Sequence, residues 1–124
     1  MNQRVLIVED QEDNRAILRD LLGNAGYDLI EATNGEQGIA LAESKRPDLI
    51  LMDVQLPIVD GYEATRRIRS NAALKSIPII AVTSYALSGD EAKARAAGCD
   101  AYVAKPFSPR QLLAKIREYL PTGA

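Results

Sequence analysis

The sequence LILM at residues 49–52 is a continuously apolar run. Two further runs, VLIV at residues 5–8 and IIAV at residues 79–82, share this character and are rich in β-branched side chains. Such runs are typical of strands that are buried on both faces of a parallel sheet. Two weaker runs occur at residues 29–32 and 101–104, and acidic neighbours indicate that the first of them is less buried. The sequence therefore predicts a sheet of about five strands.

Segments with helical signals lie between the predicted strands. Apolar residues recur at helical spacing in residues 17–25, and Gly26 follows at the position of a left-handed C-terminal cap. Apolar positions in residues 112–120 give the last helix a similar stripe, and Gly98 can close the helix before it. Side chains suited to cap a helix N-terminus are found at Asn34, Asp60, Ser88 and Ser108. The chain therefore reads as a strand followed by a helix, repeated along its whole length.

This alternation predicts a single α/β domain, the doubly wound (βα)5 fold, with a five-stranded parallel sheet and helices on both faces. The expected domain spans residues 1–124, with a folded core at about residues 3–120 and a frayed tail beyond it. A chain of 124 residues can build one core but has no room for a second folded unit. In such open sheets, ligands bind beyond the carboxyl ends of the strands, where the strand order reverses. Functional residues are therefore expected at that edge.

The composition excludes several classes of function. Lys and Arg number 15, Asp and Glu number 17, and the net charge of -2 gives no general attraction to nucleic acid or to an anionic membrane. Histidine is absent and Cys99 is the only cysteine, which excludes disulfides, ordinary zinc clusters and histidine-based catalysis. No apolar run approaches the roughly 20 residues that a membrane span needs. We therefore expect a cytoplasmic protein with no direct nucleic-acid or membrane binding, whose partners are recognised locally.

Polar residues come directly after four of the predicted strands. They are Glu9 with Asp10, Asp53, Thr83 with Ser84, and Lys105, which is followed by Pro106. The three carboxylates would repel one another at one edge of the sheet, and a hard divalent cation with oxygen ligands, Mg²⁺ above all, would relieve that repulsion. Lys105 supplies a positive charge for a carboxylate or phosphate, and Thr83 supplies a hydroxyl donor. Asp53, at the central position, can act as a nucleophile in phosphoryl transfer.

Each of these residues also has an ordinary structural explanation. An acidic pair after a strand often forms a solvated loop or a helix cap, and an aspartate after a buried run often starts a turn. Thr83 and Lys105, taken alone, would pass as strand-end or surface residues. Arg66, Arg67 and Arg69 could likewise form a partner patch, but the helix dipole alone favours cations near a helix C-terminus. What favours a site is that the groups after four strands all fall at the same edge of one sheet.

Four segments, read together, resemble the receiver domain of two-component response regulators. They are VLIVED at residues 5–10, LILMDVQLPIVDG at residues 49–61, IIAVTS at residues 79–84 and AGCDAYVAKP at residues 97–106. The resemblance covers essentially the whole chain, and residues 84–89 and 98–102 are most similar to DivK-type single-domain regulators and to the receivers of hybrid kinases. It implies the flavodoxin- and CheY-like strand order 2-1-3-4-5. It also implies a phosphorelay signalling switch, not an enzyme, that takes part in its own phosphorylation and dephosphorylation.

Motif by motif, the resemblance implies a role for each residue of the expected site. Asp53 would be the phosphoacceptor, and Lys105 would pair with the phosphoryl group. The implied Mg²⁺ ligands are the carboxylates of Glu9, Asp10 and Asp53 and the main-chain carbonyl of Gln55. Thr83 would move to bond the phosphoryl group, and Tyr102 would turn inward as Thr83 vacates its space. The family geometry also implies a cis peptide between Lys105 and Pro106.

The same resemblance implies two kinds of protein partner. A histidine kinase or a histidine phosphotransfer protein would donate the phosphoryl group, and a downstream target protein would read the switch. The expected surfaces are residues 14–21 of the first helix for the donor and residues 88–120 for the target. Tyr85 is expected to shield the phosphoryl group from water, and the alternative is a surface aromatic or a partner contact.

Three other functions fit parts of the sequence. A phosphatase of the haloacid dehalogenase type would need a second aspartate two positions after the nucleophile, where this chain has Gln55. A cofactor carrier of flavodoxin topology would need a phosphate-binding turn of bare backbone amides, but the loop after Val8 is acidic and lacks glycine. A receiver excised from a longer regulator or hybrid kinase would keep the same chemistry, and the sequence leaves this open.

Overall fold

The computed structural model describes residues 3–83 and 90–120. Within these ranges, strands and helices alternate as the sequence predicts. The strands are β1 (Arg4–Val8), β2 (Asp28–Ala32), β3 (Leu49–Asp53), β4 (Ile79–Thr83) and β5 (Ala101–Ala104). The helices are α1 (Glu12–Asn24), α2 (Gly35–Lys45), α3 (Gly61–Arg69), α4 (Asp90–Ala97) and α5 (Pro109–Tyr119). A short 3-10 helix, η1 (Ala72–Leu74), follows α3 and had no counterpart among the predicted elements.

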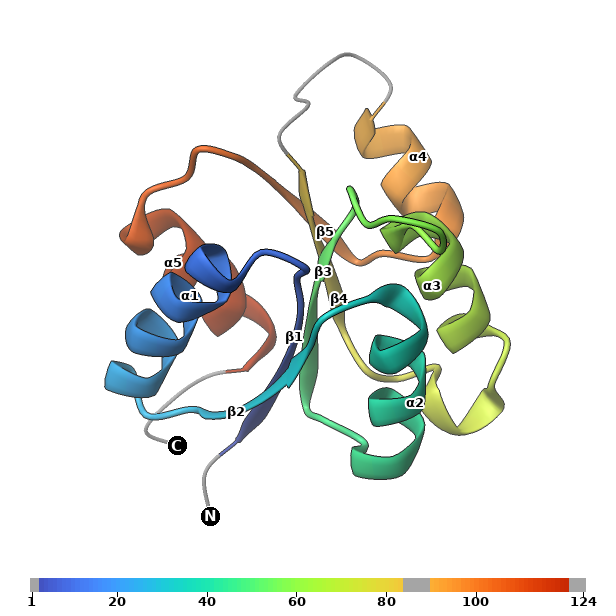
Figure 1. Ribbon diagram of the computed structural model, residues 1–124, viewed down its shortest axis with the longest axis horizontal. Coiled ribbons are helices and arrows are strands. Elements are labelled where there is room, and N and C mark those ends of the chain that lie inside the picture. The colour runs from blue at the N-terminus through green and yellow to red at the C-terminus, as the bar shows by residue number, and fades with distance from the viewer. Residues whose placement is uncertain (1–2, 84–89, 121–124) are drawn as a thin grey trace.

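The strands form one parallel sheet in the order β2-β1-β3-β4-β5, which confirms the predicted fold and strand order (Figure 1). The register is continuous across the centre of the sheet, because Val8 pairs with Met52 and Met52 pairs with Ala81. The chain moves outward from β1 to β2 and then crosses back to β3, so the strand order reverses between β1 and β3. The carboxyl ends of these two strands therefore mark the place where this fold positions a site.

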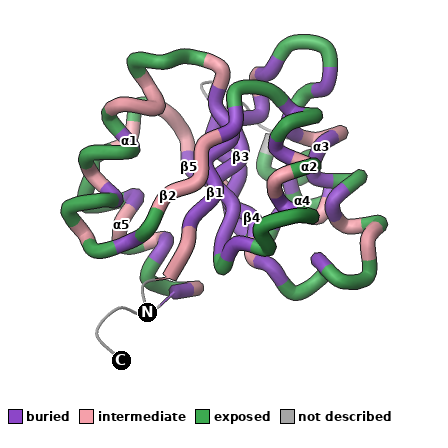
Figure 2. Tube along the Cα trace, turned by 60° about the horizontal axis from the view of Figure 1, so that its bottom comes forward, coloured by how far each residue is buried: buried purple, intermediate pink, exposed green. Residues whose placement is uncertain are grey.

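Helices cover both faces of the sheet, with α1 and α5 on one side and α2, α3 and α4 on the other (Figure 1). Side chains alternate along each strand, so Leu6 and Val8 pack with the core under α2, α3 and α4, whereas Val5 and Ile7 pack with the core under α1 and α5. Figure 2 shows that the central strands are buried along most of their length. Burial on both faces explains why their sequences are continuously apolar. The edge strand β2 is only partly buried, as its acidic neighbours indicated.

Most helix ends follow the predicted capping residues. In α2, α3 and α5, the N-cap side chain accepts a hydrogen bond from the backbone N–H of the third helical residue, and the caps are Asn34, Asp60 and Ser108. Gly26 and Gly98 close α1 and α4 with φ of 96° and 112°, a conformation that favours glycine. The predicted cap at Ser88 and the predicted tail at residues 121–124 lie outside the described residues.

Helix α1 departs from the sequence pattern at its start and on its surface. Its N-cap, Gln11, makes no side-chain cap bond. Ile17, whose spacing matched the apolar stripe, is exposed, and Leu18 and Leu22 provide the buried face. Among the helices in the described part of the chain, none is long and apolar enough to cross a membrane.

Candidate functional site

Glu9 and Asp53 lie at the carboxyl ends of β1 and β3, the two strands between which the order reverses. Strand β3 runs one residue further than the apolar pattern indicated, so Asp53 is its last residue and pairs in register with Val82. Strand alternation places Glu9 on the same face as Ile7, and Asp53 on the same face as Leu51. Both acidic residues are almost fully buried, with 2% of Glu9 and 5% of Asp53 exposed.

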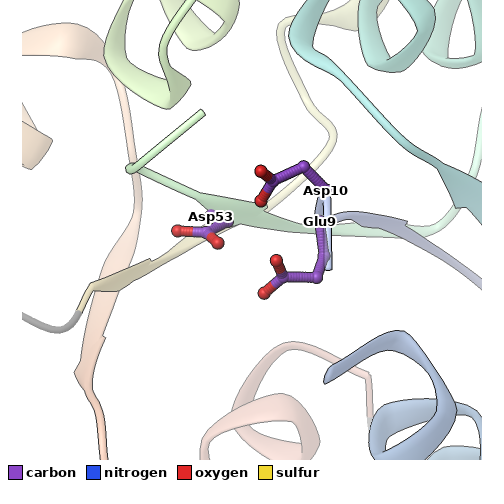
Figure 3. A group of neighbouring side chains, drawn as sticks. All are labelled: Glu9, Asp10 and Asp53. Atoms are coloured by element: carbon purple, nitrogen blue, oxygen red, sulfur yellow. The ribbon is translucent and has the colours of Figure 1, made fainter. Parts of the chain in front are cut away.

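Three carboxylates converge at this edge of the sheet. One oxygen each from Glu9, Asp10 and Asp53 lies within 4.8 Å of the others. Figure 3 shows the three side chains directing their carboxylates toward the same side of the strand ends. Oxygen ligands of this kind suit Mg²⁺, whose charge would offset the repulsion among them, so the donor set fits the predicted ion. The backbone N–H of Gln55 donates to Asp53 Oδ1 at 2.9 Å. The role of the Gln55 main-chain carbonyl as a fourth Mg²⁺ ligand stays a prediction.

Lys105 supplies the positive charge of the site. It follows β5, and its Nζ lies 3.1 Å from Glu9 Oε1 and 3.4 Å from Asp53 Oδ2. Burial opposes the charged form of this lysine, but attraction to Asp53 and Glu9 raises the pKa of Lys105 above its ordinary value. The predicted cis peptide between Lys105 and Pro106 is present. One ammonium group therefore joins the two buried carboxylates.

The two buried carboxyl groups have pKa values shifted in opposite directions. Burial raises the pKa of Asp53 to about 6, the neighbouring Glu9 carboxylate adds to the shift, and the N–H of Gln55 opposes it. Burial would also raise the pKa of Glu9, but hydrogen bonds from the Gln11 N–H and from Asp53, together with Lys105, lower it below its ordinary value. The Gln11 N–H lies 3.0 Å from Glu9 Oε2. Of the two carboxyl groups, Asp53 is therefore the first to take up a proton as the pH falls.

Close backbone packing holds the loop that follows Asp53. The N–H of Gly61, the first residue of α3, donates to the carbonyl of Val54 at 3.0 Å. A Cβ atom at Gly61 would lie 2.3 Å from the Asp53 carbonyl oxygen and 2.7 Å from Val54 Cα. The glycine of the motif LILMDVQLPIVDG is therefore needed for this contact, because any side chain would push α3 away from the backbone that carries Asp53.

Thr83 and Tyr102, the predicted switch residues, project from the same face of neighbouring strands. Thr83 ends β4, is buried, and pairs in register with Ala104. Tyr102 pairs with Ala81 and packs, partly buried, against the core under α2, α3 and α4. Strand alternation puts Thr83, two residues after Ala81, on that face as well. Their movement stays a prediction, and Tyr85, the predicted shield, lies outside the described residues.

A cavity of about 540 Å³ extends from the carboxylates toward α1. Glu9, Asp53 and Lys105 line its polar end. Its apolar walls come mainly from the inner strands, α1 and the segment after β5, with Ile17, Leu18 and Phe107 among the lining residues. The exposed Ile17 therefore lies at the rim of the site, in the segment that the family resemblance implies for the phosphodonor.

Two residues of α1 contact Glu9, although the sequence indicated them only as part of the expected donor surface at residues 14–21. Asn14 Nδ2 lies 3.4 Å from Glu9 Oε1. Arg15 Nη1 donates to the backbone carbonyl of Glu9 at 2.8 Å. For their contact with Glu9, the signal in the sequence is their position in the first turns of the helix that follows the acidic pair.

Comparison with known proteins gives a consistent result. A model of the response regulator receiver domain family matches residues 5–117. Relatives include the polar-differentiation response regulators DivK of Brucella anthropi and Brucella ovis, which are 46% and 44% identical to this chain over 120 residues. Each match covers 97% of this chain and 98% of the relative.

Solved structures share the same architecture. The receiver domain of a Pseudomonas aeruginosa sensor histidine kinase, with a magnesium ion coordinated in its active-site cleft, is 38% identical with a TM-score of 0.90. That match covers 98% of this chain and 100% of the other. The chemotaxis protein CheY4 of Vibrio cholerae is 28% identical with a TM-score of 0.91, and the match covers 96% of this chain and 99% of the other.

Proposed function

The chain belongs to the response regulator receiver domain family, and we propose that it accepts a phosphoryl group on Asp53 and thereby switches a protein-interaction surface. It is a DivK-like receiver of two-component signalling. Members of this family interact with kinases or phosphotransfer proteins and with downstream targets. The observation that carries the proposal is the meeting of Asp53 with Glu9, Asp10 and Lys105 at one sheet edge.

The proposed reaction transfers a phosphoryl group from a histidine of a partner to this chain. An oxygen of the Asp53 carboxylate attacks phosphorus, an O–P bond forms, and the P–N bond to the donor histidine breaks. The histidine nitrogen leaves with the bonding electron pair. Because the attacking group must be ionised, Lys105 assists by keeping a positive charge 3.4 Å from Asp53 Oδ2.

The residues that would hold Mg²⁺ are Glu9, Asp10, Asp53 and the main-chain carbonyl of Gln55. When bound, the ion supplies positive charge that stabilises the oxygens of the transferred group. Glu9 suits this role because the Gln11 N–H and the Lys105 ammonium favour its ionised form. The same side chains would act when the phosphoryl group is hydrolysed. The protein would therefore take part in its own phosphorylation and dephosphorylation without turning over an external substrate.

The proposed switch transmits the phosphorylation of Asp53 to Thr83 and Tyr102, which lie on the opposite face of the sheet. Thr83 would bond the phosphoryl group, and Tyr102 would occupy the space that Thr83 leaves. The support is their common face and their neighbouring strands. Phosphorylation would shift an existing equilibrium between two arrangements, through contacts made only in one of them.

The proposal extends to the partners and to the extent of the domain. A histidine kinase or histidine phosphotransfer protein would dock along residues 14–21, where the cavity beside Asp53 opens. A downstream target would read residues 88–120. We propose that residues 3–120 form the folded receiver. We also propose a cytoplasmic location, and this proposal rests on the family's signalling role alone.

The direct test is labelling by a small phosphodonor. Wild-type protein incubated with acetyl phosphate and Mg²⁺ should gain the mass of one phosphoryl group, and Asp53→Asn should gain none. Asp20→Asn, at an exposed position of α1, is the matched control and should label like the wild type. Equal labelling of Asp53→Asn, or labelling that survives EDTA, would contradict the proposal. Beryllofluoride, a phosphoryl mimic, should bind only when Mg²⁺ is present.

A further inference from the structure

Arg15 contacts the backbone of the acidic pair without being one of its proposed ligands. We propose that Arg15 is a positioning residue that orients Glu9 and Asp10 for divalent-cation binding. The inference rests on the proposed Mg²⁺ site and adds a residue of α1 to it. It is carried by the bond from Arg15 Nη1 to the Glu9 carbonyl, 2.8 Å long.

The Glu9 carbonyl belongs to the peptide that links Glu9 to Asp10. Rotation of this peptide would move both carboxylates relative to Asp53, so a donor that fixes it fixes the geometry of the acidic group. The N–H of Glu9 is held on the other side by the Ala32 carbonyl at 3.1 Å. A bond from a guanidinium to a carbonyl is charge-assisted and stronger than one between neutral groups. Arg15 therefore restrains the one peptide that carries two of the three carboxylates.

Arg15 is itself held in place by two acidic side chains. Its guanidinium pairs with Glu12 one turn away and with Glu31 on β2, where Nε lies 3.4 Å from Glu31 Oε1. Its side chain is 11% exposed, whereas that of Arg19 is 44% exposed. A guanidinium with little exposure and anchors on two sides has few alternative positions, so the orientation of the Glu9 carbonyl is maintained before a cation arrives.

Arg19 provides a matched control on the same helix. It pairs with the same two residues, at 3.2 Å from Glu12 Oε1 and 2.8 Å from Glu31 Oε1, and has no bond to Glu9 among those described. Substitution of either arginine by methionine removes one positive charge and the same pair of ionic partners. The two variants differ in the bond to the Glu9 carbonyl and in burial, since the Arg15 side chain is 11% exposed and that of Arg19 is 44% exposed.

The direction in which substitution of Arg15 changes the Mg²⁺ affinity distinguishes a positioning role from a purely electrostatic one. Removing a positively charged side chain near three carboxylates should tighten Mg²⁺ binding if charge alone matters, because the repulsion between that side chain and Mg²⁺ is lost. If Arg15 orients the ligands, Arg15→Met should instead weaken binding, by about tenfold, as is common for residues that support metal ligands. Arg15→Lys keeps one donor and the charge, and should fall between Arg15→Met and the wild type.

The experiment measures the Mg²⁺ dissociation constant of the full chain by titration calorimetry, together with the Mg²⁺ dependence of labelling by acetyl phosphate. We expect Arg15→Met to need about ten times more Mg²⁺ for half-maximal labelling, with a maximal rate near that of the wild type. Arg19→Met should bind Mg²⁺ within about twofold of the wild type. Equal constants for Arg15→Met and Arg19→Met would overturn the inference, as would tighter binding by Arg15→Met.

Two further outcomes are distinguishable. If the wild type binds no Mg²⁺ and is not labelled, the proposed function fails and this inference fails with it. If Arg15→Met does not fold, Arg15→Lys decides the question: weaker Mg²⁺ binding than in the wild type supports the inference, and an affinity equal to that of the wild type overturns it, because any positive side chain would then suffice. A thermal unfolding curve recorded in EDTA shows whether Arg15→Met is folded before any titration.

Discussion

Asp53 and Glu9 present buried carboxyl groups from the same face of two adjacent strands, and Lys105 Nζ lies 3.4 Å from one and 3.1 Å from the other. One ammonium group cannot neutralise two carboxylates, so the site carries excess negative charge when both are ionised. Burial of the Asp53 carboxyl, with the neighbouring Glu9 carboxylate adding to the effect, raises the pKa of Asp53 to about 6 in the metal-free protein. The free energy of unfolding is therefore linked to pH through Asp53.

The metal-free protein should lose stability through Asp53 as the pH rises from 3.8, the ordinary pKa of aspartate, to about 6, the folded value. In this window the native state binds more protons than the unfolded state, so the free energy of unfolding falls with rising pH. Asp53→Asn removes this contribution and should exceed the wild type at neutral pH by about 1 to 2 kcal/mol, allowing for solvent screening. Urea denaturation in EDTA at acidic and neutral pH measures the difference. An advantage that does not grow with pH would contradict the prediction, and Asp20→Asn should change stability by less than about 0.5 kcal/mol at either pH.

Arg69 should contribute far more to stability than its neighbours on α3. Its guanidinium donates to Asp100 Oδ2 at 2.6 Å and to the carbonyls of Leu74, Lys75, Ile77 and Gly98. Arg69→Met should therefore lower the free energy of unfolding by about 2 to 4 kcal/mol, because several acceptors lose a charged donor at once. Arg66→Met is the control, since the Arg66 side chain is 55% exposed against 18% for Arg69 and its ion pair is with Glu63; it should cost less than about 1 kcal/mol. Equal losses in chemical denaturation would show that the bonds of Arg69 add nothing.

The sequence was enough to predict the strands and the main residues of the site, but not the roles of individual arginines. The strands at residues 5–8, 49–52 and 79–82 were predictable because burial on both faces demands continuous apolar runs. The meeting of Glu9 with Asp53 was predictable because parallel strands bring their carboxyl ends to one edge. The roles of Arg15 and Arg69 were not, because both donate to backbone carbonyls, and every residue carries one.

The exposure of individual apolar residues also could not be predicted from the sequence. Ile17 matched the apolar spacing of the first helix but is exposed, and so is Ile58 in the loop between β3 and α3. Periodicity reports which residues share a helix face, but the width of the buried stripe depends on how closely the neighbouring elements approach. The one-residue extension of β3 to Asp53 has a similar origin, since pairing with Val82 and not apolar character decides where the strand ends.

Glycine should be favoured over alanine at position 58. Ile58 is fully exposed and has φ of 67°, in the left-handed region that costs residues with a Cβ atom about 1 to 2 kcal/mol. Ile58→Gly should therefore be more stable than Ile58→Ala by about 0.5 to 1.5 kcal/mol, opposite to the usual order in a helix. Ala40→Gly, at an exposed position inside α2, is the counterpart and should lose about 1 kcal/mol. Thermal or urea unfolding of the variants measures both, and an Ile58→Ala variant that equals or exceeds Ile58→Gly would show that the loop relaxes to another conformation.

Tyr102 should report the state of Asp53 only through the Thr83 hydroxyl. Thr83 and Tyr102 share one face of β4 and β5, whereas the Asp53 side chain starts from the other, so a signal between them must pass around the strand ends. A hydroxyl at position 83 can donate to a phosphoryl oxygen, and its displacement would free space beside Tyr102. With 3-fluorotyrosine incorporated, beryllofluoride and Mg²⁺ should shift the fluorine resonance that Tyr102→Phe removes. Thr83→Ala should still bind beryllofluoride but leave that resonance nearly unshifted, and Thr83→Ser, which keeps the hydroxyl, should restore most of the shift. If Thr83→Ala shifts the resonance as far as the wild type does, Tyr102 responds by a route that does not involve the hydroxyl, and the switch proposed for this pair is wrong.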